Sequence, residues 1–262
     1  MHGCGNDFIM LNNSDWSYDW IHENTSLIAK LCTRNFGVGS DGLILLEYEW
    51  EQIQYVMYNS DGSKAEMCGN GIRCFYKALQ RRWVHDDGLV SVITGAWLLH
   101  VQQYDDGMIL VDMGIPTIGR HDTLEYYGRP YEYRVVHTWN PHCILMNPEN
   151  TLWDKDVVCK VWPAVEYMTQ YFPKKTNVTF YKIDPDFIDL QVRERWCGYT
   201  LACGTATCGT IAWLIVEKII KPWSHCVKLP GGELVISRDG QPESSIMMAG
   251  PAEFVFEGSI TI

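Results

Sequence analysis

Two segments of this chain, 135 residues apart, begin alike, and this repetition limits the fold more than any other feature of the sequence. A predicted helix over residues 68–83 opens with Cys68-Gly69-Asn70, and a second over 203–219 opens with Cys203-Gly204-Thr205. Each opening follows a strand-like stretch and a short polar loop. Repetition in matched surroundings is typical of a duplicated structural unit. The sequence therefore predicts two α/β halves, each built around one helix, with a boundary near residues 114–116.

Short strand-like stretches fill most of the chain between these helices. Turn signals such as Asp105-Asp106-Gly107 and Arg238-Asp239-Gly240 separate them, and short strands with close turns favour antiparallel pairing. Two further helices are predicted, one over 26–35 capped by Thr25 and a weaker one over 157–171 that Pro163 interrupts. We therefore expect an α/β (α+β) fold that is mostly antiparallel sheet.

Charge and apolar runs exclude several classes of protein. Lys and Arg number 21 against 32 Asp and Glu, a formal net charge of −11, so no nucleic-acid partner is expected. No run approaches the roughly 20 apolar residues that span a bilayer, and the polar, glycine-rich start is unlike a signal peptide. We expect a cytoplasmic protein without a membrane partner, whose ten cysteines are reduced. None of them has the Cys-x-x-Cys spacing of a zinc ribbon.

A cysteine at a helix start can do acid–base chemistry. Free backbone amides and the helix dipole stabilise the thiolate, and the same amides can bind a carboxylate. If two such cysteines face one substrate, a thiolate can remove the proton beside a carboxylate while the opposite thiol returns one to the other face. The amides stabilise the enolate-like charge that develops. Such a racemisation needs neither a metal nor pyridoxal phosphate, so we expect no cofactor.

At these motifs the chain resembles the diaminopimelate epimerase family, and the likeness covers nearly its whole length. Besides the two helix openings, it is carried by His2-Gly3-Cys4-Gly5-Asn6-Asp7-Phe8, Gly37-Val38-Gly39-Ser40-Asp41-Gly42-Leu43, Asn59-Ser60-Asp61-Gly62-Ser63, Asn140-Pro141-His142, Phe172-Pro173, Asn177-Val178, Glu194-Arg195, Leu229-Pro230-Gly231-Gly232 and Gly250-Pro251-Ala252. Their shared order and spacing make chance agreement very improbable.

The resemblance implies a fold, an activity and an assembly. Two pseudo-symmetric halves are expected, each a mostly antiparallel, β-barrel-like sheet around a central helix. The first half is expected over 1–113, completed by residues 252–262, and the second over 114–251. The implied protein is a homodimeric isomerase that interconverts LL- and meso-2,6-diaminopimelate, a small amino acid of bacterial lysine and cell-wall biosynthesis, without pyridoxal phosphate.

The resemblance also implies roles for particular residues. Cys68 and Cys203 are the paired acid and base. His142 and Glu194 contact the reacting end of the substrate and support proton transfer. The amides that hold the reacting carboxylate belong to Gly69, Asn70, Gly204 and Thr205. The side chains that hold the distal amino-acid group are Asn6, Asn59, Asn140, Asn177 and Arg195. The remaining cysteines are expected to be buried structural residues.

Four positions depart from the family pattern. Trp139 and Trp196 replace glycines, Tyr199 replaces a glutamate and Ala206 replaces a glycine. Tryptophan makes a positive φ or a close backbone approach costly. We expect both tryptophan rings to turn outward while their loops keep ordinary φ angles; the opposite hypothesis is that the rings obstruct the cleft.

Other functions remain open on the sequence alone. One is a racemase or epimerase of another amino acid, as in proline racemases, although Asn70 favours the diaminopimelate branch. A second is a hydrolase that uses Cys68 and His142, which leaves the Cys203 repeat without a role. A third is an impaired homologue, to which Trp139 and Trp196 point. A dinucleotide-binding enzyme is poorly supported, because residues 69–71 lack the third glycine of that motif.

Overall fold

The structure, a computed structural model, divides the chain into two compact units. Unit 1 comprises Met1–Val111 and Gly250–Ile262, and unit 2 comprises Asp112–Ala249. The structure describes residues 1–50, 52–82, 88–104, 106–126, 128–146, 164–195 and 198–261. Trp196, and the part of the weakly predicted helix before residue 164, lie outside these ranges; residues 164–166 are helical.

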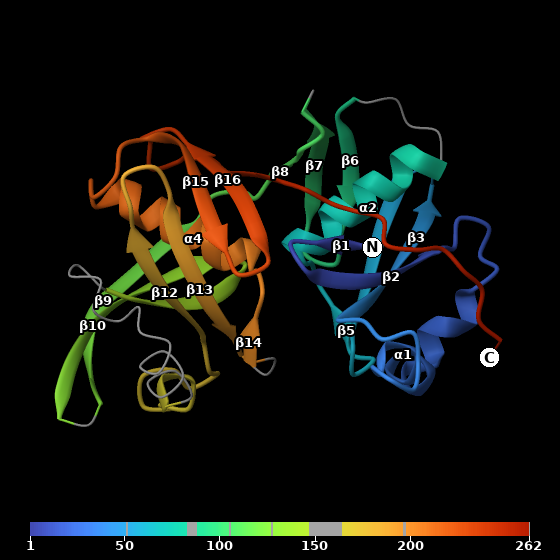
Figure 1. The fold of residues 1–262 in the computed structure, drawn as a ribbon, viewed down its shortest axis with the longest axis horizontal. Coiled ribbons are helices and arrows are strands. Elements are labelled where there is room, and N and C mark those ends of the chain that lie inside the picture. The colour runs from blue at the N-terminus through green and yellow to red at the C-terminus, as the bar shows by residue number, and fades with distance from the viewer. Residues whose placement is uncertain are drawn as a thin grey trace. The chain divides into compact units, whose positions relative to one another are not determined.

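Unit 1 is a sheet packed on one long helix (Figure 1). Its strands are β1 (His2–Gly3), β2 (Asn6–Asn12), β3 (Gly42–Glu49), β4 (Gln52–Asn59), β5 (Lys64–Ala65), β6 (Val90–Ile93), β7 (Leu98–Gln103) and β8 (Ile109–Asp112). They lie in the order β1-β2-β3-β4-β6-β7-β8, with β5 also paired to β4. The β2–β3 and β4–β6 pairs are parallel and the others antiparallel.

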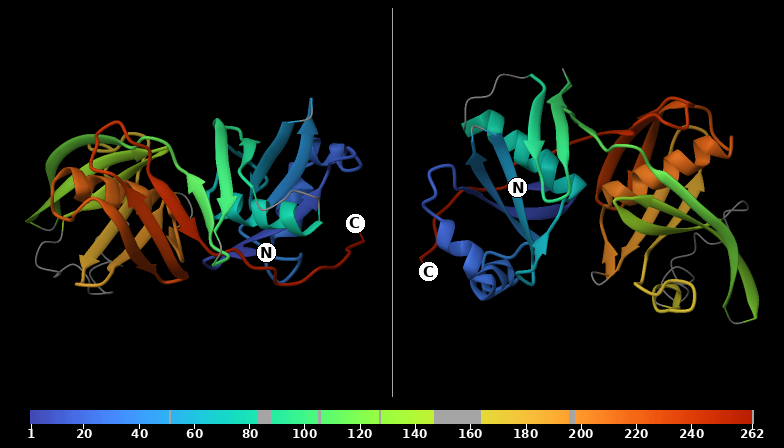
Figure 2. Two further views of the ribbon diagram at one scale, coloured as in Figure 1. Left: turned by 90° about the horizontal axis from the view of Figure 1, so that it is seen from above. Right: turned by 180° about the vertical axis from the view of Figure 1, so that it is seen from behind.

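Unit 2 repeats this arrangement. Its strands are β9 (Thr117–Tyr126), β10 (Arg129–Thr138), β11 (Asn140–Leu145), β12 (Asn177–Ile183), β13 (Ile188–Glu194), β14 (Gly198–Thr200), β15 (Trp223–Leu229), β16 (Gly232–Arg238) and β17 (Met247–Gly250). The β11–β12 and β13–β15 pairs are parallel, and β14 is the short strand on β13. Strand β10 pairs with β11 as β1 pairs with β2. Figure 2 shows the long hairpin that β10 forms with β9 projecting from this unit.

The strand registers of the two units match in the middle of each sheet, from β3 to β7 and from β12 to β16. Opposed residues there recur with both numbers 135 higher, as in Ile53–Val92 and Ile188–Val227, Met57–Ala65 and Val192–Thr200, and Val92–Leu99 and Val227–Leu234. This is the spacing of the two Cys-Gly motifs. Toward the ends of the sheets the offset changes by one or two residues. The predicted pseudo-symmetric halves are therefore confirmed. The pairings among the described residues leave the sheets open, so neither half is a closed barrel.

Each half places its long helix against the concave side of its sheet. The helices are α2 (Gly69–Arg82) in unit 1 and α4 (Gly204–Val216) in unit 2. An edge-to-face aromatic pair joins each helix to its sheet, Phe75 with Tyr55 at 5.3 Å between ring centroids and Trp213 with Tyr181 at 5.7 Å. Residues 204–215 of α4 are all buried. An all-round apolar helix needs cover on every side, which the surrounding sheet supplies.

The outer face of the unit 1 sheet is covered by η1 (Asp19–Glu23) and α1 (Thr25–Cys32). The predicted N-cap of α1 is wrong by one residue. The side chain of Asn24, not Thr25, accepts the hydrogen bond from the Leu27 amide at 3.2 Å, and Thr25 is the first helical residue. Asparagine is at least as good an N-cap as threonine, and its longer side chain reaches the third amide. In the described part of the chain no helix has the length and apolarity to cross a membrane.

Candidate active site

Cys68 lies directly before α2 in unit 1. Its carbonyl accepts the first helical hydrogen bond, from the Ile72 amide at 2.9 Å. Its thiol is partly buried and donates to Oδ1 of Asn6 at 3.5 Å. The same oxygen accepts from Nδ2 of Asn70 at 3.2 Å. The structure thus gathers three of the predicted site residues, Asn6, Cys68 and Asn70, at one helix start.

A buried arginine fixes this helix start, and it was missed by the sequence analysis. Arg73 has no exposed surface. Its guanidinium donates to the Gly69 carbonyl at 3.0 Å, to Oδ1 of Asn70 at 3.0 Å and to the Pro251 carbonyl at 3.2 Å. A charge in an apolar core is tolerated only when its donors are satisfied. The signal was available, because an arginine inside a strongly apolar motif needs such partners.

A hydrogen-bonded cluster of Asp41, Arg34 and Asp7 orients the side chain of Asn6. Its amide donates to Oδ2 of Asp41 at 2.7 Å. Arg34 in turn donates to Asp41 at 2.9 Å and to both oxygens of Asp7 at 2.7 and 3.0 Å. Burial opposes the charge on Asp7, but the hydrogen bonds and charge of Arg34 hold its pKa below the usual value. This network directs the Asn6 side-chain oxygen toward Cys68.

Cys203 is the N-cap of α4 in unit 2. Its backbone is extended, at φ −135° and ψ 106°, and its carbonyl accepts from the Thr207 amide at 3.1 Å. The thiol is buried and lies 3.4 Å from the Thr205 hydroxyl. Cys203 and Thr205 therefore mirror Cys68 and Asn70 at the start of the equivalent helix.

The expected effect on the Cys203 thiol is not found. Burial raises its pKa well above the ordinary value, and the carboxylate of Glu194, which also hydrogen-bonds to the thiol, raises it further. Hydrogen bonds from Thr205 and from the Ala206 amide act in the opposite direction but are weaker. The helix start favours the thiolate, yet loss of water and a nearby negative charge outweigh it here. Cys203 therefore holds a proton at neutral pH.

Four predicted residues form a chain of hydrogen bonds beside this helix. Nη2 of Arg195 donates to Oδ1 of Asn140 at 3.1 Å, and the Arg195 amide donates to Oδ1 of Asn177 at 2.8 Å. The amide nitrogen of Asn177 lies 3.5 Å from Nδ1 of His142. Strands β11, β12 and β13 deliver these residues from adjacent ends. A guanidinium can bind a carboxylate through two parallel N–H···O bonds, so Arg195 brings the chemistry for such a ligand to this chain of hydrogen bonds.

His142 is neutral in this setting. Its ring is fully buried, and burial lowers its pKa to about 3, with smaller effects from the positive charges of His137 and Arg195. Its Nδ1 is placed to accept from Asn177, which puts the ring proton on Nε2. Within the described residues Nε2 has no hydrogen-bond partner. A buried donor without a partner is costly, so His142 is equipped to bind a ligand group.

The repeat shows how the two halves differ chemically. In the parallel strand pairs, Phe8 opposite Gly42 in unit 1 corresponds to His142 opposite Asn177 in unit 2. Asn59 ends β4 as Glu194 ends β13. The first pair is apolar in unit 1 and polar in unit 2, and the second position changes from a neutral amide to a carboxylate. Asn59 is exposed and donates to Ser63 at 3.0 Å; among the described contacts it does not bond to the cluster around Cys68.

The positions that depart from the family pattern behave differently from one another. Ala206 is buried in the first turn of α4, and Tyr199 is 48% exposed on β14. The expectation that Trp139 keeps a negative φ is wrong, because its φ is +67°. Its ring is 44% exposed, as expected, and its indole N–H donates to the Met113 carbonyl at 2.7 Å. The indole ring thus packs toward the Met113 segment while part of it faces solvent.

Of the other described cysteines, five are buried as expected, namely Cys4, Cys32, Cys74, Cys143 and Cys208, whereas Cys226 is only partly buried. Burial raises the pKa of Cys74 to about 12 and that of Cys143 still higher. Buried neutral thiols act as small apolar side chains. Cys159 and Cys197 lie outside the described residues.

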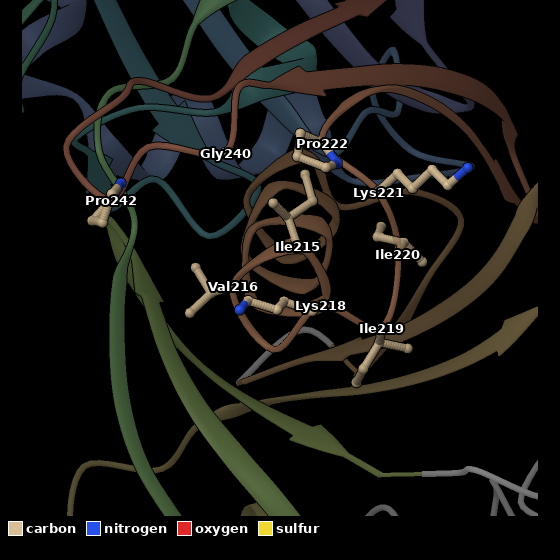
Figure 3. A pocket seen from close by; sticks show the side chains of 9 residues that line it. All are labelled: Ile215, Val216, Lys218, Ile219, Ile220, Lys221, Pro222, Gly240 and Pro242. Carbon is tan, nitrogen blue, oxygen red and sulfur yellow. The ribbon is translucent and has the colours of Figure 1, made fainter.

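A hollow at the C-terminal end of α4 contains none of the predicted site residues (Figure 3). Its lining consists of Ile215, Val216, Lys218, Ile219, Ile220, Lys221, Pro222, Gly240 and Pro242. Apart from the two lysines the lining is apolar, and it offers neither a thiol nor a carboxylate. This hollow therefore contributes no residue to the candidate site described above.

Comparison with known proteins gives a consistent result. The model of the family described as diaminopimelate epimerase matches residues 1–119 and 134–255. The diaminopimelate epimerase of Thioalkalivibrio sulfidiphilus is 35% identical over 279 residues, covering 100% of this chain and 98% of the relative. That of Synechococcus sp. strain JA-3-3Ab is 36% identical, covering 98% and 95%.

Solved structures share the fold. A phenazine biosynthesis protein of the PhzF family from Bacillus anthracis superposes with a TM-score of 0.72 at 16% identity, covering 100% of this chain and 95% of its own. A hydroxyproline epimerase from Agrobacterium vitis gives a TM-score of 0.63 at 15% identity, covering 88% and 80%. At these identities the likeness establishes the architecture alone.

Proposed function

This chain belongs to the diaminopimelate epimerase family and is an isomerase, and we propose that it interconverts LL- and meso-2,6-diaminopimelate by two-cysteine acid–base catalysis. The observation that carries the proposal is the repeat of a cysteine at a helix start. Cys68 and Cys203 stand 135 residues apart, at the same place in two units whose strand registers differ by that same number. Such a pair suits a reaction that inverts one carbon.

The proton transfer uses one cysteine as a base and the other as an acid. One thiolate takes the α-proton, the C–H electron pair remains on the carbon and spreads into the carboxylate, and the other thiol returns a proton to the opposite face. Because burial raises the pKa of Cys203, this cysteine carries a proton in the resting enzyme. Each turnover exchanges the two protonation states.

The reacting carboxylate is bound by backbone amides. The four donors are the amides of Gly69, Asn70, Gly204 and Thr205, all in the first turns of α2 and α4. Amides at a helix start carry partial positive charge and have no partner within the helix. They therefore stabilise the negative charge that moves onto the carboxylate as the proton leaves.

The remaining predicted residues bind and orient. Arg195 takes the distal carboxylate in a forked pair, and the ammonium group is accepted by side-chain oxygens of Asn6, Asn59, Asn140 and Asn177. His142 donates from Nε2 to the substrate near the reacting carbon. Glu194 holds the Cys203 thiol protonated. The contacts of Arg195, Asn140, Asn177 and His142 with one another support this division of roles.

The proposal extends to organisation and setting. We assign Cys68 to a first half over 1–113, completed by 252–262, and Cys203 to a second half over 114–251. A cytoplasmic homodimer that serves lysine biosynthesis is proposed from the family. Light scattering on the eluted protein tests the dimer, with the monomer mass of 30.1 kDa as the contrary result.

The deciding experiment follows the α-proton. The protein is incubated with LL-diaminopimelate in deuterated water, and α-deuteration and the meso product are measured by NMR and chiral chromatography. Both are expected, with one deuterium incorporated at the inverted carbon. Protein carrying both Cys68→Ala and Cys203→Ala is the control and gives neither. Absence of exchange and of the meso product with the parent protein would refute the proposal.

A further inference from the structure

The residue before each of two matching asparagines has a left-handed backbone. Gly5, at φ +79°, precedes Asn6 at the start of β2, and Trp139, at φ +67°, precedes Asn140 at the start of β11. Strand β11 follows β10 so tightly that Thr138 and Asn140 are paired, with Trp139 alone as the turn. In unit 1 the turn has two residues of positive φ, Cys4 at +53° and Gly5, between the paired Gly3 and Asn6. In both halves, therefore, a left-handed residue directly precedes the asparagine that begins the strand.

Glycine adopts this conformation freely, but tryptophan does not. A side chain at positive φ meets its own backbone, and a bulky residue there needs support from its surroundings. In unit 1 the glycine needs none. In unit 2 the left-handed turn persists although Trp139 stands where the family has glycine, so contacts made by the ring must hold it.

Those contacts lie on the segment by which the chain enters unit 2. The indole N–H of Trp139 donates to the Met113 carbonyl at 2.7 Å. A Cβ on Gly114 would lie only 2.6 Å from Cζ2 of Trp139, so the ring occupies the space that a side chain there would fill. Gly114 itself has φ +70°. The ring therefore fits only because residue 114 is a glycine.

The segment that receives the ring is firmly held. The Met113 amide donates to the Ile246 carbonyl at 2.9 Å, and the Ile246 amide donates to the Gly114 carbonyl at 2.8 Å. The Gly114 amide donates to Oδ1 of Asp112 at 2.9 Å. Trp139 is thus fastened to backbone that is itself fixed at three points.

We propose that Trp139 is a positioning residue for substrate binding. Its anchor on Met113 and Gly114 holds the left-handed turn that presents Oδ1 of Asn140 to Nη2 of Arg195, 3.1 Å away. Loss of the anchor lets the turn relax and moves Asn140 out of register with Arg195. This inference rests on the proposed role of Asn140 and Arg195 in holding the distal group of the substrate.

The test separates substrate affinity from turnover. Trp139→Ala removes the contacts of the indole ring with Met113 and Gly114 but leaves a non-glycine residue at positive φ. Gly114→Ala displaces the indole ring without changing residue 139. Each is expected to raise KM for diaminopimelate about tenfold with kcat within twofold. Trp139→Gly should raise KM less, two- to fivefold, because glycine adopts the turn unaided. In the Trp139→Gly background, Gly114→Ala should add little, because the clashing ring is gone.

Controls distinguish positioning from folding. Trp50 also has a positive φ, +51°, but is 91% exposed on the β3–β4 turn; Trp50→Ala should leave KM unchanged. A purely structural role for Trp139 would lower the melting temperature and the active fraction while KM stayed constant, and that result would overturn the inference. Full additivity of the Trp139→Gly and Gly114→Ala effects on KM would overturn it as well.

A further variant separates this inference from the proposed function. Asn140→Ala should raise KM at least as much as Trp139→Ala. If Asn140→Ala raises KM and the Trp139 and Gly114 variants do not, the anchor has no positioning role. If Asn140→Ala also leaves KM unchanged, the proposed binding role of Asn140 is wrong, and the inference falls with it.

Discussion

The thiol of Cys68 donates a hydrogen bond to the side-chain oxygen of Asn6, 62 residues earlier in the chain, at 3.5 Å. The matching asparagine of unit 2, Asn140, faces Arg195 instead. The thiol of Cys203 has a carboxylate neighbour, Glu194, which raises its pKa. Duplicated halves have thus given the two cysteines different surroundings, an amide oxygen for one and a negative charge for the other. The two cysteines of the repeat are therefore not chemically equivalent.

Single replacement of either cysteine tests the two-base scheme. Cys68→Ala and Cys203→Ala should each lower kcat for epimerisation by at least about 10²–10⁴-fold, since each removes one acid–base group. Cys74→Ala, which alters a buried cysteine within α2, is the matched control and should retain activity in the folded fraction. Activity of Cys68→Ala or Cys203→Ala within tenfold of the parent would rule the scheme out.

Removal of the Glu194 charge should lower the pKa of Cys203. With Glu194→Gln, the thiol keeps its burial but loses the repulsion between thiolate and carboxylate. Labelling of Cys203 by iodoacetamide, followed by peptide mass spectrometry across pH, should therefore begin at lower pH than in the parent. Cys226 offers a control, because Glu233 lies 3.8 Å from its thiol and also raises its pKa. Glu233→Gln should shift the labelling of Cys226 and leave that of Cys203 unchanged.

The sequence was sufficient for the parts of the fold that depend on local pattern. The two helix starts, the strand-rich composition and the 135-residue repeat are set by residue types at fixed spacings, and the structure agrees with them. Contacts between residues far apart in the chain could not be predicted from the sequence. Arg73 is satisfied by Pro251, 178 residues away, and the pKa of Cys203 depends on burial that no spacing reveals.

Trp139 and Asn24 show the same limit at short range. A tryptophan at positive φ is improbable from propensity alone, and it is found here because Gly114 leaves room for the ring. Asn24 displaces Thr25 as the helix cap because the two compete and only the geometry of the preceding turn decides. In both cases neighbouring structure, and not the preference of the residue type alone, determined the outcome.

Arg195 should decide which amino acids are accepted. Lysine lacks the second carboxylate of diaminopimelate, and an unpaired arginine in a closed site costs a few kcal/mol. We therefore expect kcat/KM for lysine to be at least about 100-fold lower. Arg195→Lys, which cannot form the forked pair, should lower kcat/KM for diaminopimelate, whereas Arg129→Lys, at an exposed site on β10, should not. Equal rates with lysine and diaminopimelate would favour a relaxed amino-acid racemase.

His142 should make the folded protein less stable in mild acid. Its pKa of about 3 in the fold lies below the ordinary value of 6.5 because the ring is buried. Between these values the unfolded chain binds a proton that the folded chain does not, so the free energy of unfolding falls as pH falls, by up to about 1.4 kcal/mol for each pH unit. Above pH 7 the ring is neutral in both states and contributes no slope.

His142→Phe isolates this effect, because the repeat already places a phenylalanine, Phe8, at the equivalent position of unit 1. Urea unfolding at several pH values between 4.5 and 7.5 should show the free energy of the variant falling less steeply than that of the parent below pH 6.5, with parallel curves above pH 7. His100→Gln changes an exposed histidine on β7 and should reproduce the parent slope. If the parent and His142→Phe lose stability in parallel down to pH 4.5, the ring takes up a proton within the fold and the assignment of a neutral His142 is wrong.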